Sequence, residues 1–181
     1  MAVPVEKNNQ KNTKNAEEYF ETVLNVRRVA KVIKGGRRFA FSALVVVGDR
    51  DGSVGFALGK SRDVSSAISK ALKKARKSMF TFPMHNTTLP FTVQAKYSAS
   101  KVLLRRASKG TGIIAGGAVR AVMEALGVKD ILTKTLGSHN PHNVVQATIK
   151  ALGMLRSGKD IAAMRGKTLK DLFGEDENVT A

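Results

Sequence analysis

The segment from Lys34 to Lys60, KGGRRFAFSALVVVGDRDGSVGFALGK, limits the possible fold more than any other part of the chain. Apolar side chains recur at every second position over 39–47 and again over 54–58, which is the period of a half-buried β-strand. Two glycines precede the first run, and the polar stretch 49–52 separates the two runs, so a turn is expected at each place. Together with a strand expected over 23–33, this pattern predicts a three-stranded antiparallel meander.

The region around the first expected turn is strongly basic. Residues 27–38 contain six cations and no acid, namely Arg27, Arg28, Lys31, Lys34, Arg37 and Arg38. The chain of 181 residues carries 31 Lys and Arg against 14 Asp and Glu, so its formal net charge is +17 and its pI is about 10.5. A surface that only keeps a protein soluble favours interspersed signs, whereas a cluster of one sign indicates a polyanionic partner, and we expect nucleic acid.

A basic helix is expected after the meander. Asp63 can cap it, and apolar residues over 64–79 recur at spacings of three and four, so one helical face is expected to be buried. The opposite face carries four lysines, Lys70, Lys73, Lys74 and Lys77. Such a face is either simply solvated or touches nucleic acid, and we favour contact because two other basic segments precede it.

The second half of the chain predicts a mixed domain. We expect strands over 91–96, 102–106 and 131–136, and helices over 118–126 and 141–155, the last one starting at the helix signal Asn140-Pro141. Two small domains are therefore expected. The expected divisions are a disordered basic arm over 1–15, an N-terminal RNA-binding-like domain over 16–85, a C-terminal α/β domain over 86–165, and a tail over 166–181 with a short helix near 169–173.

Gly55, Gly59, Lys60 and Ser61 resemble a phosphate loop, but their spacing argues against one. Only three residues separate the first glycine from the Gly-Lys-Ser end, whereas a phosphate loop needs four. Those three residues belong to an expected strand. The small side chains on its second face would let a helix or an RNA backbone come close.

The segment Gly110–Ala115 resembles a dinucleotide fingerprint, with Asp130 twenty residues after its first glycine. Because Asp130 opens its expected strand, it is expected to point to the far side of the sheet, away from any ribose at the glycine loop. Basic residues precede the loop, so we expect backbone amides here to hold a phosphate of a polymer instead. The residues expected to bind RNA here are Arg105, Arg106, Lys109, Gly110, Thr111 and Gly112.

No catalytic centre, metal site or cofactor is expected. His139 and His142 lie three residues apart without an accompanying carboxylate, and the chain has no cysteine for a thiolate, a disulfide or a zinc ligand. No apolar run approaches the roughly 20 residues that span a bilayer, and residues 1–18 lack the apolar centre of a secretory signal. We therefore expect neither a membrane partner nor secretion.

Three blocks of the sequence together resemble the bacterial-type ribosomal protein five of the small subunit. They are KGGRRFAFSALVVVGDRDGSVGFALGK from Lys34, GTGIIAGGAVRAV from Gly110 and GSHNPHNVVQATIKAL from Gly137, and the resemblance covers about 23–174. It implies an α+β protein. The expected N-terminal domain is similar to a double-stranded-RNA-binding fold, with a three-stranded antiparallel sheet and a helix, and the expected C-terminal domain has two α/β layers and a left-handed β-α-β crossover.

The resemblance also implies a place for the protein and some of its contacts. The family lies between the head and the body of the small subunit in cytoplasmic ribosomes, with organellar ribosomes left open. The loop 29–36 would reach ribosomal RNA near the spectinomycin site, with Val29, Ala30 and Lys31 at positions tied to drug sensitivity. Gly112 and Arg120 would face small-subunit protein four at an interface that influences decoding accuracy. Protein eight and messenger RNA on its way into the subunit are further expected neighbours.

We therefore expect a non-catalytic constituent of the small ribosomal subunit that binds ribosomal RNA and stabilises the head relative to the body. The residues expected to bind RNA are Arg27, Arg28, Lys31, Lys34, Gly35, Gly36, Arg37, Arg38, Lys60, Arg105, Arg106, Lys109, Gly110, Thr111 and Gly112. The alternative is a free duplex-RNA-binding chaperone or regulator. Such a protein would use the same N-terminal half but would have no need for the blocks at Gly110 and Gly137.

Overall fold

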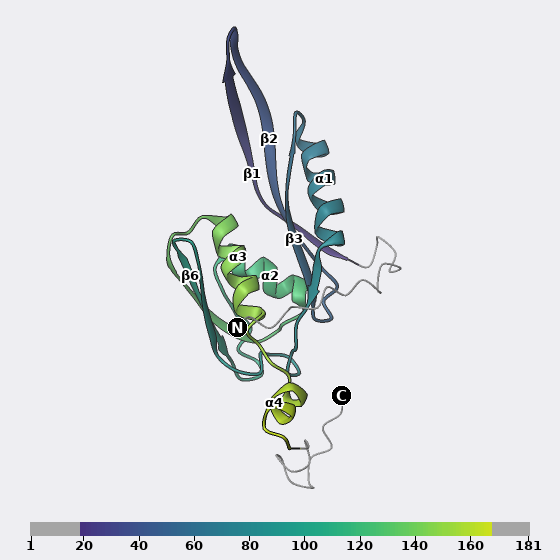
Figure 1. The fold of residues 1–181 in the computed structure, drawn as a ribbon, viewed down its shortest axis with the longest axis vertical. Coiled ribbons are helices and arrows are strands. Elements are labelled where there is room, and N and C mark those ends of the chain that lie inside the picture. The colour runs from purple at the N-terminus through teal and green to yellow at the C-terminus, as the bar shows by residue number, and fades with distance from the viewer. Residues whose placement is uncertain (1–18, 168–181) are drawn as a thin grey trace.

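The computed structural model describes residues 19–167, which form two four-stranded sheets and four helices (Figure 1). The α+β class expected from the sequence is confirmed. The arm expected over 1–15 and the short helix expected near 169–173 lie outside the described residues. Within the described part of the chain, no helix combines the length and the apolar character that crossing a bilayer requires.

The first sheet is antiparallel and has the strand order β1-β2-β3-β4. Its strands are β1 (Phe20–Ile33), β2 (Gly36–Gly48), β3 (Ser53–Ser61) and β4 (Met79–Thr81). The expectation of three strands was wrong by one. β4 has three residues, too few for a period of two to be recognised, and it is held by its pairing with β3 from Ser53 to Gly55.

Helix α1 (Val64–Lys77) covers one face of this sheet. Asp63 caps it by accepting a hydrogen bond from the backbone amide of Ser66, as the sequence predicted. The apolar stripe of the helix is made of alanines, and together with apolar residues of β2 and β3 it forms a small core: Ala43, Val45, Val47, Ala57, Ala67, Ala71 and Ala75. Side chains this small let the helix lie close to the strands.

Two glycines of β3 set this close approach. A Cβ atom on Gly59 would overlap the carbonyl oxygen of Ala67, and one on Gly55 would overlap that of Ala75. The sequence left open whether a helix or an RNA backbone comes close to this strand. The structure shows that it is α1.

The second sheet has the order β5-β6-β8-β7, from β5 (Val93–Tyr97), β6 (Ser100–Arg106), β7 (Ile113–Ile114) and β8 (Ile131–Gly137). β7 and β8 are parallel and are joined by α2 (Gly117–Leu126), which makes the β-α-β unit that the resemblance implied. The hand of its crossover stays a prediction. α3 (Pro141–Leu152) ends three residues earlier than expected, and β7 and α4 (Gly158–Met164) were not predicted because they contain two and seven residues.

One continuous core joins the two sheets. Leu44 and Val46, on the face of β2 away from α1, belong to the same buried cluster as Val122, Leu126 and Val145 of the helices of the second half. Backbone hydrogen bonds tie the turn after β2 to the end of α2, from Arg50 to Ala125 at 3.0 Å and from Gly52 to Leu126 at 3.0 Å.

Two glycines allow this contact between the halves. A Cβ atom on Gly48 would overlap the carbonyl oxygen of Ala125, and one on Gly127 would overlap that of Arg50. Gly127 also has a φ of 92°, in the left-handed region that ends many helices. The turn after β2 and the end of α2 therefore interlock through backbone atoms.

Candidate nucleic-acid interface

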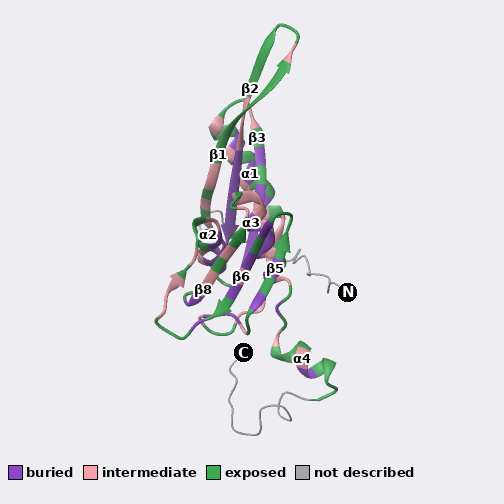
Figure 2. Cartoon of the chain, turned by 90° about the vertical axis from the view of Figure 1, so that its left-hand side faces the viewer, coloured by how far each residue is buried: buried purple, intermediate pink, exposed green. Residues whose placement is uncertain are grey.

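The outer half of the β1–β2 hairpin projects beyond the rest of the protein (Figure 1). β1 and β2 remain paired as far as Ile33 and Gly36, and Lys34 and Gly35 form the turn between them. Gly35 has a φ of 97° and Gly36 a φ of 132°, which explains the two glycines at this place. Residues 26–32 and 34–39 are all exposed, as the green tip in Figure 2 shows.

Eight of the expected RNA-binding residues lie on this hairpin and are exposed. They are Arg27, Arg28, Lys31, Lys34, Gly35, Gly36, Arg37 and Arg38. The structure thus collects this part of the expected site on one two-stranded ribbon. The positions expected to be tied to drug sensitivity, Val29, Ala30 and Lys31, lie on its first strand and are exposed as well.

The pairing of the strands sets positive charges against each other. Lys31 lies directly opposite Arg38 in the antiparallel ladder, and Arg37 lies opposite the exposed apolar residue Val32. Like charges on directly opposite residues destabilise a sheet by roughly 0.2–1 kcal/mol. Among the described residues there is one ion pair, between Arg76 and Glu21 at 2.6 Å, and it lies at the other end of β1. The charges of the hairpin therefore favour an anionic partner.

Phe39 adds a flat apolar surface to the same ribbon. It lies on the same face of β2 as Val45 and Val47, as the alternation predicted, but it is 50% exposed. It lies on the half of β2 that projects beyond the helices. The guanidinium carbon of Arg28 lies 4.7 Å from the centre of its ring, so the two side chains form a stacked pair. The only sign of Phe39 as a site residue in the sequence was an aromatic residue directly after the basic run 27–38.

Lys60 lies within β3 and is exposed. The three residues before Gly59 also belong to this strand, as the sequence predicted, so no loop encloses a phosphate here. Lys60 pairs with Ser42 of β2, which in turn pairs with Arg27 of β1. The three side chains form one row across the sheet, on the face opposite α1.

The glycine loop 110–112 does not offer free backbone amides. The Asp130 carboxylate accepts hydrogen bonds from the amides of Gly110 at 2.9 Å and Gly112 at 3.0 Å, and the amide of Thr111 donates to the carbonyl of Ser108 at 3.2 Å. The expectations that these amides hold a phosphate and that Asp130 points away from the loop were both wrong. Asp130 is only 4% exposed, and its carboxylate supplies the anion itself.

These hydrogen bonds also affect the acidity of Asp130. The bond from the amide of Gly112 contributes most, followed by one from the side chain of Thr87, and with the Gly110 amide they lower the pKa of Asp130 against the opposing effect of burial. The charged carboxylate is therefore the form that holds the loop closed. Any contact of the loop with RNA depends on its side chains.

Arg105, Arg106 and Lys109 are exposed and form a second basic cluster. Arg105 and Arg106 end β6, where they pair with the first residues of β8. The other end of β6, at Ser100, pairs with Gly137, close to the start of α3. The structure therefore places this cluster at the opposite end of the second sheet from the start of α3 and does not join it to the hairpin.

Gly112 and Arg120 lie beside each other at the edge of the second sheet. Arg120 is exposed and donates a hydrogen bond of 3.1 Å to the carbonyl oxygen of Ile113, the residue after Gly112. β7 is an edge strand, and its residue Ile114 is 53% exposed. Apolar and charged side chains thus meet at an unpaired strand edge, which is a common basis for binding another protein.

His139 and His142 lie near the start of α3. In residues 19–167 no group of three or more side chains from His, Cys, Asp and Glu is close enough to hold a metal ion. α3 begins at Pro141 after Asn140, as predicted, but the side chain of Asn140 makes no capping hydrogen bond. His142 faces a pocket between α3 and the first sheet.

Comparison with known proteins gives matches along almost the whole described chain. A family model described as ribosomal protein S5, N-terminal domain, matches residues 19–83, and one described as ribosomal protein S5, C-terminal domain, matches residues 95–165.

Individual relatives are similar over most of their length. A Treponema denticola protein named small ribosomal subunit protein uS5 is 56% identical over 158 residues, which cover 87% of this chain and 91% of the relative. Proteins of the same name from Lawsonia intracellularis and Marinobacter nauticus are 55% and 52% identical, over 84% and 90% of this chain and 93% and 98% of their own lengths.

Proposed function

The chain belongs to the ribosomal protein S5 family, and from this membership we propose how it holds ribosomal RNA. It is a structural constituent of the small ribosomal subunit, and binding of ribosomal RNA follows from the family. The family is structural rather than catalytic, in keeping with the expectation from the sequence.

The main contact with ribosomal RNA is made by the outer half of the β1–β2 hairpin. The observation that carries this assignment is the direct pairing of Lys31 with Arg38 on an exposed ribbon that contains no acid. A phosphate between the two strands would relieve their mutual repulsion. Arg28 stacked on Phe39 offers a flat surface to a base on the same ribbon.

A second contact uses the cluster Arg105, Arg106 and Lys109 at the end of β6. Because Asp130 already occupies the amides of the neighbouring glycines, these long side chains carry the contact. Two separate basic surfaces on one rigid protein allow it to hold two regions of RNA in a fixed arrangement. This arrangement supports a role in stabilising the head of the subunit relative to the body.

The edge of the second sheet near Gly112 and Arg120 is proposed as the interface with small-subunit protein four. The exposed Ile114 on an edge strand and the ordered guanidinium of Arg120 support a protein partner rather than RNA. This interface would carry the influence on decoding accuracy. We also propose contacts with protein eight and with incoming messenger RNA. Residues 29–31 are proposed to lie near the spectinomycin site.

The division of the chain is proposed at the boundaries expected from the sequence, with the N-terminal RNA-binding-like part over 16–85 and the C-terminal α/β part over 86–165. The two sheets of the structure fall on either side of this boundary. We also propose a cytoplasmic ribosome as the location, because the relatives are small-subunit ribosomal proteins of bacteria. No enzymatic activity is proposed.

Gradient fractionation of ribosomes tests the function. The tagged chain is expected in stoichiometric amount in the small-subunit fraction, and a mostly free pool would contradict the proposal. A variant with Lys31, Lys34, Arg37 and Arg38 all replaced by Ala is expected to move toward the free fractions.

The matched variant replaces Lys70, Lys73, Lys74 and Lys77 of α1 by Ala and removes the same charge from another surface. If both variants shift equally, the hairpin is not the main contact, whether total charge governs assembly or the α1 lysines bind RNA as strongly. A shift of the α1 variant alone would assign the main contact to α1 instead.

A further inference from the structure

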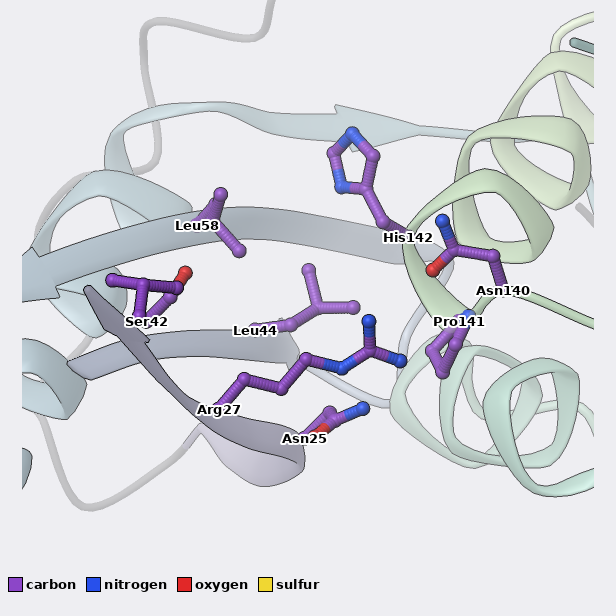
Figure 3. A pocket seen from close by; sticks show the side chains of 9 residues that line it. Asn25, Arg27, Ser42, Leu44, Leu58, Asn140, Pro141 and His142 are labelled. Atoms are coloured by element: carbon purple, nitrogen blue, oxygen red, sulfur yellow. The ribbon is translucent and has the colours of Figure 1, made fainter. Parts of the chain in front are cut away.

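A small pocket lies where the first sheet meets the start of α3 (Figure 3). Its volume is about 200 Å³, below the range of roughly 300–1,000 Å³ that is usual for drug-sized ligands, so it suits a small group. It is lined by three strands and one helix end, through Asn25, Arg27, Val29, Ser42, Leu44, Leu58, Asn140, Pro141 and His142. No acidic side chain is among them.

The strand pairing explains the chemistry of this lining. One row across the sheet contains Asn25, Leu44 and Leu58, which gives an apolar floor with an amide at its rim. The next row contains Arg27, Ser42 and Lys60, so two cations flank a hydroxyl beside that floor. Figure 3 shows Arg27 extending along the sheet toward Pro141.

The helix end adds a further polar feature. α3 has 12 residues, begins with Pro141 and has no acid in its first turn, and the Asn140 side chain does not cap it, so its positive end faces the pocket uncompensated. The Nδ1 atom of His142 is buried and makes no hydrogen bond within the described part of the chain. Because this atom has almost no accessible surface, a group bound in the pocket does not reach it.

We propose that this pocket binds one unpaired nucleotide of RNA, with its base against Leu44 and Leu58 and its phosphate near Arg27 and Lys60. The inference rests on the proposed function, because it takes RNA as the partner. A base has an apolar face for the floor and polar edges for the amides of Asn25 and Asn140, and a phosphate complements the cations and the positive helix end. The small volume excludes a base pair, so the nucleotide is bulged, looped out or single-stranded.

A binding assay on the full-length protein tests the proposal. The probe is a pentaribonucleotide with 2-aminopurine at its centre, and the comparison probe has an abasic centre with the same phosphates. The protein is expected to bind the first probe at least about fivefold more tightly than the second at the same salt concentration, because only the base occupies the floor. Fluorescence of the 2-aminopurine is expected to change on binding.

Two variants locate the binding. Leu58→Trp fills the pocket and is expected to abolish the preference for the base, whereas Val32→Trp adds the same side chain at an exposed hairpin position and is expected to keep it. Arg27→Gln changes an exposed side chain that the fold does not require. It is expected to lower the slope of log affinity against log salt by about 0.7 and to leave the preference for the base in place.

The outcomes separate this proposal from the proposed function. Equal affinity for the two pentamers, or an unchanged preference in Leu58→Trp, overturns the pocket while binding of full-length small-subunit ribosomal RNA still supports the function. If the unaltered protein does not bind full-length small-subunit ribosomal RNA, both the pocket and the proposed function are overturned. Saturable micromolar binding of free AMP or UMP would show a mononucleotide site and would overturn RNA as the occupant.

Discussion

The carboxylate of Asp130, directly before β8, accepts a hydrogen bond of 3.0 Å from the backbone amide of Gly112, directly before β7. The same oxygen accepts a second bond of 2.9 Å from Gly110. A sequence that resembles an anion-binding loop therefore has an anion built into it. The loop is shaped by this internal contact before any partner arrives.

Asp130→Asn is expected to change how stability depends on pH. Because the folded protein lowers the pKa of Asp130, the charged carboxylate stabilises the fold above the ordinary value near 4, and this stabilisation is lost as the pH falls through the lowered pKa. The stability difference between the two proteins should be largest near neutral pH and should shrink below about pH 4. Urea midpoints measured from neutral to acidic pH check this. Asp51→Asn, at an exposed turn, is the control, and a difference that stays constant with pH would contradict the assignment.

Replacing Arg37 and Arg38 together with Ala is expected to weaken association with small-subunit ribosomal RNA. If each residue neutralises one phosphate, the slope of log affinity against log salt should fall by about 1.5. A filter-binding series at increasing salt measures this slope. The double variant Lys101→Ala and Lys134→Ala removes the same charge from exposed residues of the second sheet and should leave the slope nearly unchanged. Equal slopes for all three proteins would remove Arg37 and Arg38 from the site.

Lys31→Glu is expected to have opposite effects on the free protein and on its complex with RNA. The new carboxylate faces Arg38 across the ladder, so unfolding should cost a few tenths to about 1 kcal/mol more than in the unaltered protein. Affinity for ribosomal RNA should fall because a cation becomes an anion at the contact. Chemical denaturation and RNA binding are measured on the same preparation. Lys129→Glu makes the same charge change at an exposed position outside the sheets, next to Asp130, and is the control, which should not stabilise the protein.

Gly59→Ala is expected to destabilise the first sheet by about 1–3 kcal/mol. Its new methyl group would overlap the carbonyl oxygen of Ala67 and push α1 away from β3. Gly117→Ala is the matched control, because a Cβ atom at the first residue of α2 meets nothing within 4 Å and alanine is a better helix former than glycine. Thermal unfolding should show a lower midpoint for the first variant alone. An unchanged midpoint for Gly59→Ala would contradict the close contact between α1 and β3.

The sequence predicted the elements whose residues repeat over a sufficient length. β2 and β3 have clear alternation, α1 has a full apolar stripe, and the start of α3 has the pair Asn140-Pro141. β4 and β7 have three and two residues, so no period can be seen, and they exist because neighbouring strands pair with them.

The sequence predicted that the candidate site is basic, but not which way its side chains point. The run of cations indicated the hairpin, and the register then placed Lys31 against Arg38. Alternation alone could not tell that α1 stops short of Phe39, which leaves this side chain half exposed. Nor could it tell that Asp130 turns toward the glycine loop, since this depends on the path of the chain between β7 and β8. The pocket beside Arg27 requires residues far apart in the sequence, and no local pattern indicates it.

The interlock of Gly48 with Ala125 and of Gly127 with Arg50 has a consequence for the order in which the protein can form during synthesis. α1 follows β3 directly in the chain, so one face of the first three strands can be covered early. The face with Leu44 and Val46 is covered by α2 and α3, and α3 is complete only when the chain has been made as far as Leu152. Until then the nascent protein exposes an apolar sheet face next to a strongly positive hairpin. Exposure of the positive hairpin and closure of the core are therefore separate steps in the formation of one chain.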